Sequence, residues 1–102
     1  MPRRDTRPYR DPFDPFHPVV AQLDLHGLGA EEAGRVVTGF LRSWSKRGKG
    51  NVVHVITGRG RGSLGRPVLP GVVKRVLTGE CAELVERWQK DENEGGVLVR
   101  LK

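Results

Sequence analysis

Residues 19–27 read Val19-Val20-Ala21-Gln22-Leu23-Asp24-Leu25-His26-Gly27, an apolar run that ends in a carboxylate, an imidazole and a glycine. The apolar positions predict a strand over residues 19–26, which Gly27 ends. Side chains at i and i+2 of a strand share a face, so Asp24 and His26 are expected to lie together. A carboxylate beside an imidazole suits acid/base catalysis, which makes these two the candidate catalytic residues. The structural alternative is that Asp24 caps a helix terminus and His26 satisfies a backbone carbonyl.

Elements of alternating type follow this strand. A helix is expected over residues 30–47, where apolar side chains recur at steps of three and four: Ala33, Val36, Val37, Phe40, Leu41 and Trp44. Residues 51–57 are β-branched, which is typical of a central strand buried on both faces. A second helix is expected from near Pro67–Pro70 to Gly79. Residues 81–89 fit either type; a strand is favoured because Gly95-Gly96 and the apolar run 97–101 indicate a closing hairpin.

The predicted order β-α-β-α-β-β indicates an α/β two-layer sandwich, in which a mixed sheet is covered by two helices. A strand, a crossover helix and a second strand in one sheet form a right-handed parallel unit, so the carboxyl ends of the first two strands meet at one edge. Both helices begin at that edge, where their N-termini favour an anion. Ligands of open α/β sheets bind outside the carboxyl ends of the strands.

A glycine-rich segment follows the second strand: Thr57-Gly58-Arg59-Gly60-Arg61-Gly62-Ser63. Small residues let backbone N–H groups approach a phosphate closely, and arginines add charge-assisted contacts. A dinucleotide-binding loop is excluded because it belongs at a first strand, and a Walker loop because no Lys-Ser/Thr follows the glycines. The alternative is a flexible turn with solvated arginines. The candidate nucleic-acid-binding residues are Gly27, Thr57, Gly58, Arg59, Gly60, Arg61, Ser63 and Arg66.

Charge is distributed unevenly over the 102 residues, which carry a formal net charge of +6. Residues 23–79 hold ten Lys or Arg against three acidic residues, whereas residues 80–102 hold four against six. A basic centre favours a polyanionic partner, nucleic acid before membrane. The single cysteine excludes an intramolecular disulfide and a cysteine metal cluster. No signal peptide or membrane span is visible, so the cytosol is the expected compartment.

The first 18 residues contain five of the seven prolines, with Tyr9, Phe13 and Phe16 spaced among them. Prolines remove backbone donors and oppose helices and ladders, so residues 1–18 are predicted to form a flexible tail and residues 19–102 the folded domain. Two interpretations of the tail stay open. It is either an arm that reaches RNA or a partner, or an extension whose aromatic side chains pack on the domain surface.

The pair Leu-Asp-Leu-His-Gly and Thr-Gly-Arg-Gly, with a Gly-Gly before the last strand, resembles the Smr (small MutS-related) domain family from about Val20 to Lys102. The resemblance implies a sandwich similar to the C-terminal domain of a bacterial translation initiation factor, and nucleic-acid binding often accompanied by nicking or RNA cleavage. By position, Asp24 and His26 match the family's Asp-x-His pair, and residues 57–60 match its Thr-Gly-x-Gly loop. Some members carry a histidine shortly after that loop, where this chain has Arg61-Gly62-Ser63, which places more weight on His26.

The expected function is phosphodiester cleavage, of RNA before DNA. RNA carries its own 2′-hydroxyl nucleophile, so one imidazole and positive charge suffice without a metal or other cofactor. DNA nicking calls for an activated water and a divalent cation, Mg²⁺ or Mn²⁺, held by Asp24. The alternatives are a non-catalytic nucleic-acid module using the same crevice, or a ribosome- or protein-binding adaptor using a basic helix face: Arg35, Arg42, Lys46, Arg47 and Lys49.

Overall fold

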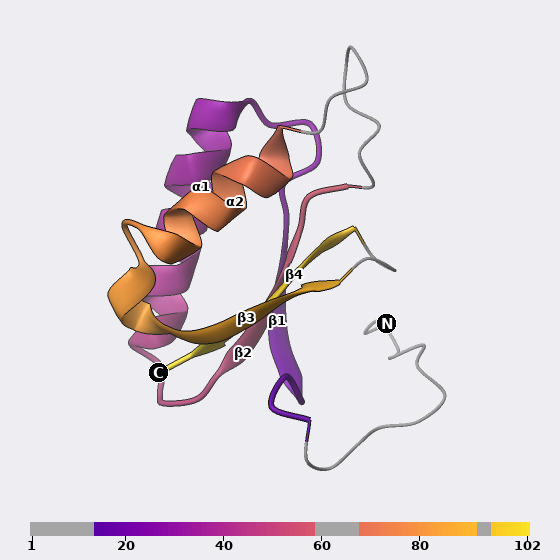
Figure 1. Cartoon of the computed structure of the whole chain (residues 1–102). Helices are drawn as coiled ribbons and strands as arrows, with labels where there is room; N and C mark the ends of the chain where they lie inside the picture. Colours follow the sequence, from indigo (N-terminus) through magenta and orange to yellow (C-terminus); the bar gives the residue numbers. More distant parts are fainter. Residues whose placement is uncertain (1–13, 59–67, 92–94) are drawn as a thin grey trace.

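The computed structural model describes residues 14–58, 68–91 and 95–102. The strands and the two α-helices follow one another in the order that the sequence predicts, β-α-β-α-β-β, with a 3-10 helix before the third strand (Figure 1). The elements are β1 (Val19–Asp24), α1 (Ala30–Ser45), β2 (Val52–Ile56), α2 (Leu69–Thr78), the 3-10 helix η2 (Ala82–Leu84), β3 (Val85–Asp91) and β4 (Gly96–Leu101).

The four strands form one mixed sheet in the order β1-β2-β4-β3. Strands β1 and β2 are parallel, whereas β2 pairs with β4, and β4 with β3, in antiparallel register. The predicted parallel β-α-β unit and closing hairpin are thereby confirmed. Because β2 lies inside the sheet with α1 and α2 over one face, its residues Val52–Val55 are buried, as a two-sided apolar run predicts.

Both helices cover the same face of the sheet (Figure 1), which gives the expected two-layer sandwich. The buried stripe of α1 comprises Ala33, Val37 and Leu41, at the helical spacing that the sequence shows. Helix α2 buries Val72, Val73, Val76 and Leu77, and it begins with a proline in its first turn. Truncating one of these fully buried leucines to alanine costs about 2–5 kcal/mol, so this layer supplies much of the domain's stability.

The opposite face of the sheet carries a smaller apolar cluster, made by Phe16, Val52 and Leu98. The Phe16 side chain is 4% exposed, and Arg100 Nη1 donates a hydrogen bond of 2.9 Å to the carbonyl of Pro15. Residues 14–18, predicted to end a flexible tail, therefore pack on the sheet. Proline does prevent a helix here, but it does not prevent an aromatic anchor from docking. Residues 1–13 lie outside the described part of the chain.

The stretch 81–89, expected to be a strand throughout, divides into η2 and the first part of β3. The Cys81 amide donates to Val76 and the Leu84 amide to the carbonyl of Cys81, so the chain turns tightly after α2 before it extends. The buried Cys81 holds this turn against the helical layer. Of the helices described, none has the length and apolar character needed to cross a membrane.

Candidate functional site

One edge of the sheet, which we call the rim, collects the ends of all four strands. Asp24, Ile56, Gly96 and Asp91 lie in a single register row across β1, β2, β4 and β3. Both helices also begin at this end of the molecule (Figure 1). The two sequence motifs therefore emerge side by side, as predicted, and the N-terminal dipoles of α1 and α2 favour an anion there.

His26 occupies the corner of a tight turn immediately after β1. The Leu28 amide donates to the carbonyl of Leu25 at 3.0 Å, and Gly27 at the second corner has φ of 87°, as a type II turn requires. Leu25 is fully buried and its amide donates to the Ile56 carbonyl at 2.8 Å, which ties the turn to β2. The sequence Leu-His-Gly thus combines a buried anchor, an exposed imidazole and the glycine that the turn needs.

Asp24 acts on the backbone of this turn. Its Oδ1 accepts a hydrogen bond of 2.9 Å from the backbone N–H of His26. The strand ends at Asp24, so the i, i+2 rule that predicted a shared face does not extend to His26. Within the described residues, the carboxylate makes no hydrogen bond or ion pair with the His26 ring. Asp24 therefore fixes where the imidazole is presented by shaping the chain, and both side chains remain exposed to solvent.

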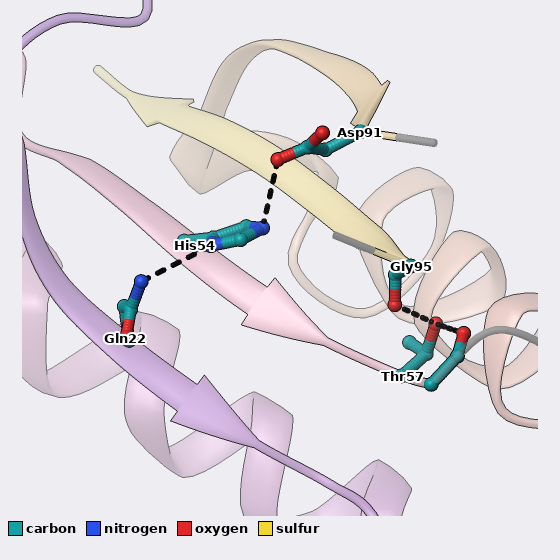
Figure 2. Close-up of polar contacts among 6 residues, drawn as sticks. Gln22, His54, Thr57, Asp91 and Gly95 are labelled. Atoms are coloured by element: carbon teal, nitrogen blue, oxygen red, sulfur yellow. Dashed lines mark hydrogen bonds and ion pairs between the residues drawn. The ribbon is translucent and has the colours of Figure 1, made fainter. Parts of the chain in front are cut away.

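The start of the glycine-rich segment is hydrogen-bonded to the turn between β3 and β4 through one carbonyl oxygen. The carbonyl of Gly95 accepts from the amide of Thr57 at 2.8 Å, from the amide of Gly58 at 2.9 Å and from the Thr57 hydroxyl at 2.8 Å. Figure 2 shows the Thr57 hydroxyl directed at this oxygen. Thr57 is only 9% exposed, and Gly58 and Gly95 have φ of 94° and 67°.

These bonds change the predicted roles of the first two loop residues. Thr57 and Gly58 were expected to contact a phosphate, but their donors are already engaged by Gly95, so in this structure they anchor the loop. Apart from Gly27 in the turn after β1, the remaining predicted nucleic-acid-binding residues fall in the segment 59–67, outside the described part of the chain: Arg59, Gly60, Arg61, Ser63 and Arg66. What the structure places is the origin of that segment, at the rim and beside the His26 turn.

A polar row under the rim, with His54 at its centre, was not predicted from sequence. The His54 side chain, 4% exposed, has Nδ1 3.4 Å from Gln22 Nε2 and Nε2 3.2 Å from Asp91 Oδ2 (Figure 2). A Gln22 amide that donates to Nδ1 leaves the ring proton on Nε2, facing the carboxylate. A Cβ at Gly96 would collide with the Val55 carbonyl and press on His54. The lack of a side chain at Gly96 therefore leaves room on β4 for the contact between His54 and Asp91.

The described residues contain neither a reactive thiolate nor a preformed metal-binding cluster. Burial raises the pKa of the Cys81 thiol, and the positive charge of Arg42 only partly opposes this, so the thiol is held neutral and unreactive. Asp24 and Asp91 are separated by three strand spacings, about 14 Å, which is too far to share an ion. Within residues 14–58, 68–91 and 95–102, no group of three acidic, histidine or cysteine side chains is arranged to hold a metal.

Comparison with known proteins finds similarity over the region of the chain that carries both motifs. The family model described as the Smr domain matches residues 23–102, which include both motifs. Among solved structures, the crystal structure of the human small-MutS related domain aligns with a TM-score of 0.56 and 31% sequence identity, covering 78% of this chain and 99% of that one. No curated protein sequence matches the chain.

Proposed function

Because the chain belongs to the Smr domain family, we propose that it is an endonuclease that binds nucleic acid at the rim and cleaves phosphodiester bonds in RNA. Members of this family are in general nucleic-acid-binding, nuclease-like modules. The observation that carries the proposal is the position of His26, exposed at the corner of a hydrogen-bonded turn and beside the anchored start of the glycine-arginine loop.

In the proposed reaction, His26 acts as general base and then as general acid. It takes the proton of the 2′-hydroxyl, whose oxygen attacks phosphorus. The bond from phosphorus to the 5′-oxygen breaks, and that oxygen takes the proton from His26. The products are a 2′,3′-cyclic phosphate and a free 5′-hydroxyl. A 2′-hydroxyl held next to its own phosphate supplies the proximity that one imidazole alone does not.

The other proposed residues hold the phosphate or the geometry. Asp24 positions His26 through its backbone amide, and Gly27 allows the chain to turn. Arg59 and Arg61, with the amides of their loop, would stabilise the charge on the pentacoordinate phosphorus. Ser63 and Arg66 extend the same anion-binding segment. No metal is required for this route, whereas hydrolysis of DNA would need an activated water and a Mg²⁺ or Mn²⁺ ion, with Asp24 as the proposed ligand.

The deciding experiment incubates end-labelled structured RNA and supercoiled plasmid with the protein and with His26→Ala, each with and without EDTA. We expect RNA cleavage in EDTA, cyclic phosphate ends, and loss of cleavage in His26→Ala with binding largely kept. His17→Ala is the matched control, because it removes an imidazole that lies before β1, at the far end of the strand from the rim. Equal cleavage by the protein and His26→Ala would refute the proposed role of His26.

A second candidate is a nucleic-acid module without catalysis. It is favoured by one observation, that the Asp24 carboxylate is engaged by the backbone and not by the imidazole. Such a module would show no turnover in any variant, and Arg59→Ala would reduce its affinity. An enzyme, in contrast, loses turnover in His26→Ala before it loses binding. The same measurements therefore separate the two functions.

A further inference from the structure

A groove runs between α1 and α2 on the side of the helical layer that faces away from the sheet. It encloses about 680 Å³, and its walls include Arg35 and Arg42 from α1 and Arg75 from α2. These arginines are exposed, and within the described residues none of them makes an ion pair with a carboxylate. Glu31 and Glu80 also line the groove, so its charged lining comprises three positive and two negative side chains, a net charge of +1.

Glycine in the groove wall gives a second, independent observation. Gly39 lies in the interior of α1, where glycine is one of the poorest helix formers. A Cβ built at Gly39 would meet nothing within 4 Å, so no neighbour among the described residues requires the residue to be small. At Gly34, by comparison, a Cβ would contact the Val72 side chain at 3.7 Å. The open backbone at Gly39 leaves room for a ligand to approach the helix between the arginines.

The groove begins at the rim. Ala30 and Glu31, in the first turn of α1, belong to both its wall and the end of the molecule where β1 and β2 finish (Figure 1). From there it passes Arg35 and then Arg42, which lies about two helical turns, or about 10 Å, beyond Arg35. A polyanion bound at the rim can therefore continue into the groove without crossing another of the helices and strands that the structure describes.

We propose that this groove binds the phosphate backbone of a single nucleic-acid strand as it leaves the rim. The inference rests on the proposed function and adds a path for the flanking strand. Arginine favours phosphate because its planar fork donates two parallel hydrogen bonds. The groove is open to solvent and its volume lies in the range of small-molecule sites, which suits a few nucleotides of one strand. An acidic protein segment is the competing occupant, which the continuity with the rim disfavours.

The test measures binding of a fluorescent single-stranded oligoribonucleotide over a range of salt concentrations. All variants are made in the His26→Ala background so that no RNA is cut. The groove variant combines Arg35→Gln, Arg42→Gln and Arg75→Gln. The control combines Arg87→Gln, Lys90→Gln and Lys102→Gln, which removes the same charge from exposed positions outside the groove. We expect the slope of log K against log salt to fall by about 2 in the groove variant, near 0.7 for each lost phosphate contact, and to change little in the control.

Gly39→Leu provides a test that removes no charge. Leucine favours a helix, so the fold is kept, but the new side chain enters the groove and should weaken binding of a long oligonucleotide more than of a short one. Equal losses in the groove and control variants would overturn the proposal, as would unchanged affinity in Gly39→Leu. Binding of polyglutamate that depends on the groove, while RNA binding does not, would instead assign the groove to a protein partner. Retained cleavage in His26→Ala would refute the proposed catalytic role, and the binding series would then use a 2′-O-methyl oligonucleotide, which lacks the free 2′-hydroxyl that the proposed route needs, so that the groove is still tested.

Discussion

Replacement of Thr57 by valine distinguishes an anchoring role from direct contact with nucleic acid. Valine is close in shape to threonine but lacks the hydroxyl that donates to Gly95 at 2.8 Å. The Gly95 carbonyl would still accept from the amides of Thr57 and Gly58, so no buried acceptor is left without a partner. The loss is therefore that of one hydrogen bond, about 1 kcal/mol. For a domain of this size, that lowers Tm by about 4–8 °C.

The assay pairs urea denaturation with the RNA-cleavage measurement, for Thr57→Val and for Thr57→Ser. Serine keeps the hydroxyl and should keep the turnover of the unmodified protein, although it loses a buried methyl group. In Thr57→Val we expect the drop in stability together with slower turnover, because the loop that carries Arg59 and Arg61 starts from a looser anchor. Unchanged stability combined with weaker RNA binding would refute this reasoning and restore Thr57 as a direct phosphate contact.

Three further predictions concern the rest of the fold. Gly96→Ala should lower the free energy of unfolding measured in urea by about 1–3 kcal/mol, because the new methyl group collides with the Val55 carbonyl. Gly39→Ala should raise it by up to about 1 kcal/mol, because alanine is the better helix former and meets no described neighbour. Equal effects of the two substitutions would contradict the packing described. Phe16→Ala should cost about 3 kcal/mol in the same assay if residues 14–18 dock as described, and almost nothing if they do not. Cys81 has a raised pKa in the folded state, so the neutral thiol contributes stability at neutral pH that is lost as pH rises above about 8.5, where the unfolded thiol ionises. Cys81→Ala should flatten that decline in a pH series of denaturation curves.

Sequence patterns were sufficient for the order of elements and for the meeting of the two motifs. Apolar periodicity distinguishes helix from strand. The handedness of a β-α-β unit brings the carboxyl ends of β1 and β2 to one edge of the sheet, independent of the conformation of the loops. This is why the placement of His26 at the rim followed from residues 19–58 alone, whereas its position in a turn after the strand, and not on the face of Asp24, did not. The family resemblance then agreed with the match over residues 23–102.

What sequence did not reveal depends on partners far apart along the chain. The Thr57 hydroxyl is bound by a carbonyl 38 residues away, so nothing local to the motif shows that it is already engaged. His54 likewise meets Asp91 on a strand with which β2 does not pair directly. Arg75 was not among the candidate residues, because its place in the groove beside α1 depends on how the two helices pack. Each of these roles depends on tertiary contacts, which local sequence propensity does not predict.

The shared acceptor at Gly95 also supplies a built-in reporter. The amide hydrogens of Thr57 and Gly58 both point at this oxygen, so they exchange with solvent only when the loop separates from the hairpin. A ligand that tightens the loop must slow both exchange rates together, and a ligand that binds elsewhere leaves them unchanged. Two resonances in an NMR spectrum would therefore reveal whether a given nucleic acid engages this loop, even for a variant that cuts nothing.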